Sequence, residues 1–121
     1  MNREIKFRAI HGDNVYYSDS QSGADKLGCK LGSSIISCFF NHFYWWSTLG
    51  QFTGLKDKNG VDIYEGDILK RSTGEIGKII FNEMVGMWDF CSTTRELNIP
   101  LFNVRSDSEV IGNIHQNPEL L

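Results

Sequence analysis

The stretch from residue 51 to 69 constrains the fold most, because turn-forming residues separate short runs of strand-forming residues there. Asn59-Gly60 lies between the runs 53–57 and 61–64. Asn-Gly supplies the positive φ angles that a type I′ turn needs, so the pattern predicts a β-hairpin. Glu65-Gly66 then turns the chain again, and another strand is expected to follow.

Turn signals continue at short spacing up to residue 114. Further strands are expected at 68–69, 76–81, 87–90 and 109–114, with turns or loops at 72–75 and 82–86. Pro100 interrupts this pattern, and 101–104 is expected to pair at a sheet edge. The spacing favours a small antiparallel barrel or sandwich, and an SH3-like barrel of residues 52–114 fits the size. The tail 115–121 is expected to form a short turn with its two leucines tucked against the barrel.

The N-terminal residues carry a second hairpin signal. Apolar and polar residues alternate over 3–9, a turn signal follows at 12–14, and 15–17 is suited to return as a strand. The predicted fold class is therefore mainly β with minor α. Residues 1–50 are expected to hold the N-terminal hairpin and a variable aromatic-rich segment packed on the barrel. Residues 51–121 are expected to hold the barrel and the C-terminal tail, and the two parts together form one compact unit.

Charge and cysteine content limit the partners and the compartment. The net charge is −3, and residues 51–121 carry seven Lys/Arg against eleven Asp/Glu. Nucleic-acid binding relies on cations that neutralise phosphates, so the acidic charge argues against a nucleic-acid partner. The three cysteines are an odd number without C-x-x-C spacing, which indicates reduced thiols and a cytoplasmic protein. Residues 1–9 hold four charged residues and no apolar stretch, and no apolar run of about 20 residues occurs, so neither a secretory signal nor membrane association is expected.

The most hydrophobic segment is 35–46, which is expected to be extended, although a short apolar run is also compatible with a buried helix. Six aromatic residues fall within eight positions: Phe39, Phe40, Phe43, Tyr44, Trp45 and Trp46. On a strand, one small core buries only about half of such a set, since alternate side chains face opposite sides. The rest are explained by a second packing layer against the N-terminal hairpin or by an interface, most simply self-association. These six residues are the candidate interface, and the surrounding negative charge argues against base stacking by them.

Four carboxylates lie close together in the sequence, at Asp57, Asp62, Glu65 and Asp67. A cation site or an acid/base pair is one interpretation. The favoured interpretation is turn chemistry, because Asp57 flanks a tight hairpin and Asp67 follows a glycine, where short side chains bond backbone amides.

The sequence holds no recognised pattern of catalytic or ligand-binding residues. The three histidines and three cysteines are scattered, without the spacing of a zinc site. Phosphate-binding glycine patterns and nucleophile elbows are both missing from the sequence. We therefore expect no enzyme activity, no cofactor and no metal, although a site assembled from the segments 18–50 and 82–108 would escape this reasoning.

Three segments resemble a known family. They are Arg3 to Ala9 at the start, Gln51 to Gly60 continued by Ile63 to Ile68 in the centre, and Glu109 to Ile114 followed by Asn117 to Leu121 at the end. Together they resemble the YopX family of phage and prophage proteins. Family members typically carry an aromatic residue directly after the opening segment, where this chain has Ile10-His11, and the segments 18–50 and 82–108 follow no family pattern.

The resemblance implies a mobile genetic element inside a bacterium, and it implies no reaction, because the family has no established enzymatic activity. The function predicted is a non-catalytic protein-interaction accessory module that self-associates into a homo-oligomer, with a host or phage protein as a further partner. The alternative is a nucleic-acid-binding barrel acting in phage replication or expression. That alternative requires five cations to lie on one face: Lys56, Lys58, Lys70, Arg71 and Lys78.

Overall fold

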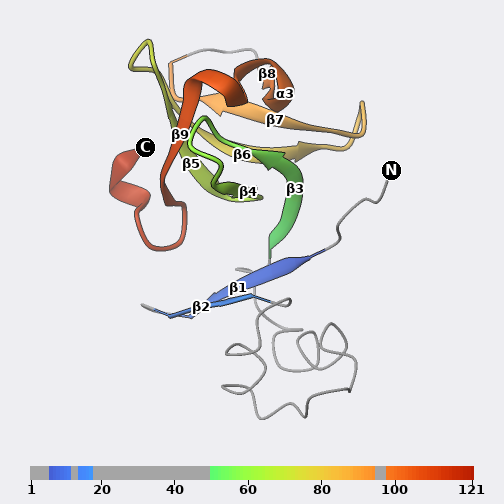
Figure 1. The fold of residues 1–121 in the computed structure, drawn as a ribbon, viewed down its shortest axis with the longest axis vertical. Helices are drawn as coiled ribbons and strands as arrows, with labels where there is room; N and C mark the ends of the chain where they lie inside the picture. Colours follow the sequence, from blue (N-terminus) through green and yellow to red (C-terminus); the bar gives the residue numbers. More distant parts are fainter. Residues whose placement is uncertain (1–5, 12–13, 18–49, 95–97) are drawn as a thin grey trace. The chain divides into compact units, whose positions relative to one another are not determined.

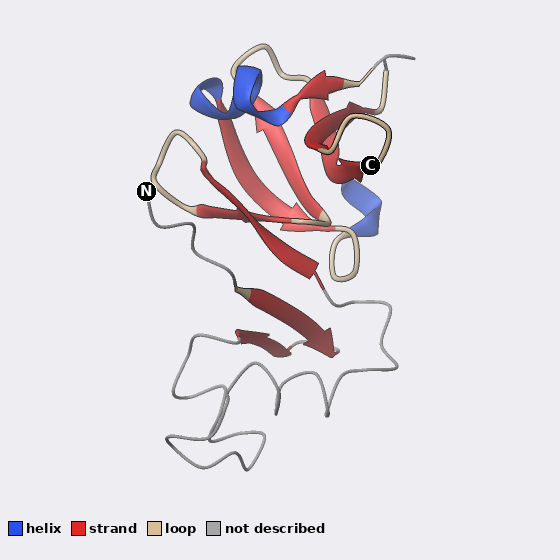
Figure 2. Cartoon of the chain, turned by 90° about the vertical axis from the view of Figure 1, so that its right-hand side faces the viewer, coloured by secondary structure: helices blue, strands red, loops and turns tan. Residues whose placement is uncertain are grey.

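The structure is a computed structural model of the chain. It describes residues 6–11, 14–17, 50–94 and 98–121. The chain divides into two units, Met1–Gln51 and Phe52–Leu121. The fold is mainly β, as predicted, with antiparallel pairing throughout the described strands (Figures 1 and 2).

In the first unit, β1 (Phe7–His11) and β2 (Asn14–Tyr17) form an antiparallel hairpin with Ile10 opposite Val15. The predicted N-terminal hairpin is therefore confirmed. β1 also pairs with the first residues of β3 (Gly50–Lys56), where Phe7 lies opposite Gln51. The predicted aromatic-rich segment falls between β2 and β3 and lies outside the described residues.

The second unit contains the remaining strands, one short helix and two 3-10 turns. In chain order after β3 these are β4 (Asp62–Tyr64), β5 (Asp67–Arg71), β6 (Ile76–Asn82), β7 (Met87–Ser92), β8 (Ile99–Pro100), α3 (Leu101–Val104), η1 (Arg105–Asp107), β9 (Ser108–Asn113) and η2 (Pro118–Leu120). β3 and β4 form one hairpin, and five strands form a sheet in the order β8-β7-β6-β5-β9 (Figure 1). The strands predicted between residues 53 and 114 are confirmed, apart from the edge strand at 101–104.

The five-stranded sheet does not close into the barrel that the sequence suggested. Among the described strands, β8 and β9 are the two edges of the sheet and do not pair with each other. β8 has only two residues, and one of them is Pro100, which has no backbone N–H to donate. The chain then enters α3 and η1 before it returns as β9 (Figure 2). The segment between β8 and β9 is therefore helical and adds no strand that could close the sheet.

The prediction of an edge strand at Leu101–Val104 is wrong, because these residues form α3. Leu101 and Val104 are both buried in the core. Residues three apart share one face of a helix, whereas on a strand the same two side chains would point to opposite faces. Burial of both apolar side chains therefore favours the helical turn. None of the helices in the described part of the chain is long and apolar enough to cross a membrane.

The core of the second unit lies between the sheet, the β3–β4 hairpin and α3. Its buried members are Ile63, Leu69, Ile79, Phe90, Leu101 and Val104, with Leu55, Trp88, Ile99 and Val110 packed against them. Gly77 on β6 is required by this packing. A Cβ atom there would lie 2.6 Å from the carbonyl oxygen of Cys91 and 2.8 Å from the ring of Phe90.

The β3–β4 turn differs from the predicted type I′ turn. Gly60 has φ +80°, but Asn59 does not have a positive φ. The N–H of Gly60 donates to the carbonyl of Asp57 (3.1 Å), and the N–H of Asp57 donates to the carbonyl of Val61 (2.9 Å). The loop therefore has three residues and ends in a left-handed glycine, the next most common way to close a hairpin. The β5–β6 turn repeats this arrangement with Gly74 at φ +91°.

The C-terminal tail turns as predicted and is organised by Asn113. The side-chain oxygen of Asn113 accepts the N–H groups of His115 (3.0 Å) and Gln116 (2.9 Å). The side-chain oxygen of Asn117 in turn accepts the N–H of Asn113 (3.2 Å). The prediction that both terminal leucines are tucked in is wrong for Leu121, whose side chain is exposed.

Candidate interaction surface

The six aromatic residues of the predicted interface all lie outside the described residues: Phe39, Phe40, Phe43, Tyr44, Trp45 and Trp46. The candidate surface is therefore built from the second unit, starting with the residues that the sequence singled out there.

Asp57 stabilises the backbone at two places. Its Oδ1 accepts the N–H groups of Asn59 (2.8 Å) and Val61 (2.9 Å), which fixes the β3–β4 turn. Its Oδ2 accepts the N–H of Val110 on β9 (2.9 Å). The main-chain N–H of Lys58 also donates to the carbonyl of Ser108 (3.0 Å), so the turn is attached to β9 by two contacts. A buried carboxylate with three backbone donors is well satisfied, and its role here is structural.

Two of the other three carboxylates, Asp67 and Asp62, have contacts of their own. Asp67 is buried, and its Oδ2 accepts the N–H of Tyr64 (2.8 Å) across the turn at Gly66. Asp62 pairs with Lys56 at 3.3 Å (Oδ1 to Nζ) on the β3–β4 hairpin. The turn interpretation is confirmed for Asp57 and Asp67. No group of three or more His, Cys, Asp or Glu side chains suited to a metal occurs within the ranges that the structure describes.

Arg71 is held between two acids at the end of β5. Its Nη1 lies 3.0 Å from Glu75 Oε1, and its Nη2 lies 3.1 Å from Asp107 Oδ2. The hydrogen bond from Arg71 lowers the pKa of the Asp107 carboxyl from its ordinary value of 3.8. The same bond, with that to Glu75, raises the pKa of Arg71. The guanidinium is thus used within the fold and joins the β5–β6 turn to η1.

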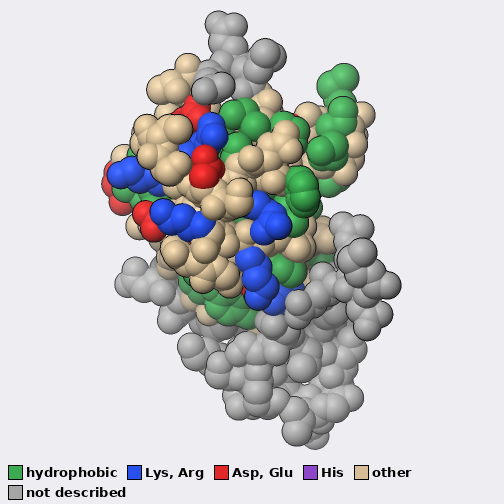
Figure 3. Space-filling model, turned by 45° about the horizontal axis from the view of Figure 1, so that its top comes forward, with side chains coloured by type: hydrophobic (Ala, Val, Ile, Leu, Met, Phe, Trp, Pro, Cys, Tyr) green, Lys and Arg blue, Asp and Glu red, His purple; other side chains and the backbone are tan. Residues whose placement is uncertain are grey.

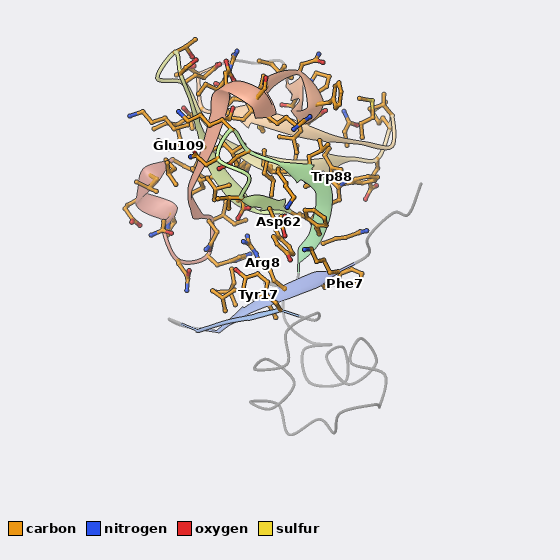
Figure 4. The ribbon with its side chains drawn as sticks, viewed as in Figure 1. Phe7, Arg8, Tyr17, Asp62, Trp88 and Glu109 are labelled. Carbon is orange, nitrogen blue, oxygen red and sulfur yellow. The ribbon has the colours of Figure 1, made fainter. Side chains whose placement is uncertain are left out.

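The five cations of the nucleic-acid hypothesis do not form one patch. Arg71 and Lys70 are adjacent on β5 and so point to opposite faces of the sheet. Lys70 lies directly opposite Glu109 on β9, and Lys56 is paired with Asp62. Figure 4 labels Glu109 on β9, at the side of the unit away from Trp88. Lys70 and Lys56 thus each lie beside an acid.

The β6–β7 hairpin carries a set of apolar side chains that extends beyond the core. Phe81 lies opposite Trp88, and their rings are 5.0 Å apart in an edge-to-face arrangement. The preceding pair on the same face, Ile79 and Phe90, belongs to the buried core. The aromatic pair therefore continues the core stripe outward along the hairpin, and Trp88 lies on β7 at that end (Figure 4).

Four residues at the end of this hairpin are exposed, and we call them the apolar tip. Their exposed fractions are 43% for Phe81, 95% for Met84, 61% for Val85 and 43% for Met87. Figure 3 shows hydrophobic side chains projecting on the side of the unit where this hairpin lies, whereas Asp and Glu gather on the other side together with several Lys and Arg. Sequence reasoning missed this surface. The signal available was Met84-Val85 inside a segment assigned as a loop, where polar residues are usual.

The backbone of the apolar tip is fixed by Asn82. The side-chain oxygen of Asn82 accepts the N–H of Met84 (3.1 Å), and its amide nitrogen donates to Asp89 (2.9 Å). The carbonyl of Asn82 accepts the N–H of Gly86 (2.9 Å), which has φ +67°. The exposed side chains are therefore presented by an ordered turn, and binding through them would cost little backbone ordering.

The comparison with protein families agrees with the segments at both ends and in the centre. The family described as YopX protein matches residues 5–121. The chain belongs to the YopX family. A crystal structure of protein EF1440 from Enterococcus faecalis is similar at 37% sequence identity, over 65% of this chain and 60% of that one, with a TM-score of 0.46. This YopX chain thus spans 60% of the length of EF1440, and no curated protein matches it.

Proposed function

We propose that this YopX chain is a non-catalytic protein-interaction module of phage or prophage origin that acts in the bacterial cytoplasm and associates with itself. The observation that carries the proposal is the apolar tip of the β6–β7 hairpin. Monomeric proteins rarely leave a contiguous apolar patch of more than a few hundred Å² in water, and such patches commonly mark interaction sites.

The absence of enzyme activity is part of the same proposal. It is supported by the use of the buried acids within the fold: Asp57 and Asp67 accept backbone N–H groups. Arg71 is likewise engaged by two carboxylates. Side chains that serve as structural acceptors are poorly placed to exchange protons with a substrate, because each exchange would break a backbone contact.

Nucleic-acid binding is the alternative function, and the arrangement of charges gives it less support. A salt titration of single-stranded DNA and RNA binding tests it directly. Binding that weakens steeply as salt rises would favour the alternative, since cation–phosphate contacts release counterions. Binding that is missing, or unchanged by salt, would remove it.

The main test compares the wild-type chain with a Met84→Ser/Val85→Ser double mutant. Light scattering gives the mass of each in solution, and each is used as bait for proteins of the bacterial host. We expect the wild type to be larger than a monomer or to retain a specific protein, and we expect the double mutant to lose what the wild type shows. The proposal would be overturned by a wild type that is strictly monomeric and captures only proteins that the double mutant also captures.

A further inference from the structure

We infer that the apolar tip is a two-fold contact at which a second copy of this chain packs its own β6–β7 hairpin. This inference rests on the proposed function and deepens it by naming the partner and the surface. In a two-fold contact the same patch meets itself, so the patch must be self-complementary in chemistry and large enough when doubled.

The area of the apolar tip meets the size requirement for a weak dimer. With the exposed fractions given above, and about 200 Å² for a fully exposed large side chain, the apolar tip offers roughly 450 Å² of surface. Two copies that meet at their tips would bury at most about 900 Å², because Phe81 and Met87 lie on opposite faces of the hairpin, and this is the size of a weak interface. The remaining exposed part of Trp88 adjoins the apolar tip and adds to this area.

The charge around the apolar tip also favours a second copy. Glu83 is the only charged residue from Phe81 to Trp88, and no Lys or Arg occurs there. An anionic bilayer is bound through Lys and Arg beside the apolar residues, and nucleic acid through cations, so neither occupant fits this composition. An apolar surface with aromatic and Met side chains fits another surface of the same kind, because Met adapts to irregular gaps and aromatic rings anchor interfaces.

The structure of the hairpin supports a direct meeting of the two tips. Phe81 and Trp88 form an edge-to-face pair on one face of the hairpin. Met87, which lies opposite Asn82, is on the other face. The loop residues Met84 and Val85 lie between β6 and β7, and their exposed fractions are 95% and 61%. A contact centred on the loop therefore brings Val85 of one copy against the loop of its partner.

The test is sedimentation equilibrium of the full-length chain from low micromolar to near-millimolar concentration. Val85→Glu places a charge in the contact and is expected to raise the dimer dissociation constant at least tenfold, which corresponds to about 1.4 kcal/mol. Thr73→Glu is the matched control, since it adds the same charge to the exposed tip of the β5–β6 hairpin and should leave the dimer unchanged. Met84→Ser, which adds no charge, is the second substitution and should also weaken the dimer.

Each outcome separates this inference from the proposed function. A wild-type dimer that Val85→Glu and Met84→Ser leave intact means that the copies meet elsewhere, so the inference falls and the proposed function stands. A wild type that is monomeric at every concentration overturns the inference together with the self-association in the proposed function, and the bait experiment then decides whether the chain is an interaction module for another protein. Sedimentation with neutral phosphatidylcholine vesicles that depends on Val85 would make a lipid surface the occupant and would also overturn the inference.

Discussion

Replacement of Asp57 by alanine is expected to lower the free energy of unfolding by about 3 kcal/mol. The carboxylate accepts three backbone N–H groups, from Asn59, Val61 and Val110. The N–H of Val110 belongs to a half-buried residue, and its bond to a charged acceptor is worth about 1.5–3 kcal/mol. Asn59 and Val61 are exposed, so water replaces the lost acceptor there and each bond contributes only about 0.5 kcal/mol.

Urea unfolding followed by tryptophan fluorescence measures this loss, because Trp88 packs against the core. With a denaturant slope of about 2 kcal/mol per molar, the midpoint should fall by roughly 1.5 M. Asp57→Asn should lie between the wild type and Asp57→Ala, since the amide keeps one acceptor oxygen but turns a second donor toward a backbone N–H.

Lys58→Ala is the matched control for Asp57→Ala. Its side chain is exposed in the same turn, and its contact to the carbonyl of Ser108 is made by the main chain. It should therefore stay within about 0.5 kcal/mol of the wild type. If Asp57→Ala also stayed within about 0.5 kcal/mol, the carboxylate would not hold the turn to β9 and the reasoning would be refuted.

Three further predictions concern other packed or paired groups. Gly77→Ala should lower the free energy of unfolding by about 1–3 kcal/mol, because the added methyl meets the backbone carbonyl of Cys91 at 2.6 Å. Thermal unfolding measures this loss, and a loss of less than about 0.5 kcal/mol, as for an ordinary surface substitution, would contradict the prediction. In Gly112→Ala the added methyl would lie 2.5 Å from the Asn117 side chain. The loss of unfolding free energy should therefore be smaller when Asn117→Ala is also present, and strictly additive losses in the double mutant would argue against the clash. Asp107→Asn should cost less than about 1 kcal/mol at pH 7, because its pair with Arg71 is partly exposed. Since the pKa of Asp107 is lowered by folding, this contribution is present above pH 3.8 and is lost as the pH falls through the folded value; a difference from the wild type that persisted in acid would contradict it.

Local patterns predicted the strands of the second unit because each strand is bounded by turn residues that act within a few positions. Asp57 and Asp67 were interpreted correctly for this reason, as their acceptor roles in the turns are local. The contact from Asp57 to Val110 was not predictable, because it joins residues 53 positions apart. The exact turn type was missed as well, since the side chain of Asp57 favours a three-residue loop over the Asn-Gly type I′ turn.

Two features could not be predicted from local patterns: whether the sheet closes, and whether residues 101–104 form a strand or a helical turn. Both depend on which side chains the rest of the fold buries. A segment of four residues after a proline, with three apolar side chains and Asn103, is compatible with a strand or with a helical turn. Burial of both Leu101 and Val104 against the core decides in favour of the turn, and this burial is known only once β7 and the β3–β4 hairpin are in place. The apolar tip was missed for a related reason: the pattern of β6 and β7 is typical of core strands throughout, and only the structure shows where the core ends.

The residues that carry the family resemblance and the residues of the apolar tip serve separate purposes, and mutation can separate them. Asp57, Asp67 and Asn113 lie in the recognised segments and accept backbone N–H groups, so they determine the fold. The apolar tip lies outside those segments, and Met84 contributes an almost fully exposed side chain to it. Met84→Ser should therefore weaken association while the unfolding free energy stays within about 0.5 kcal/mol. Asp57→Ala should lower stability while the remaining folded molecules associate as the wild type does. If both substitutions changed stability and association together, the apolar tip would be part of the folding core and recognition would have to reside elsewhere in the chain.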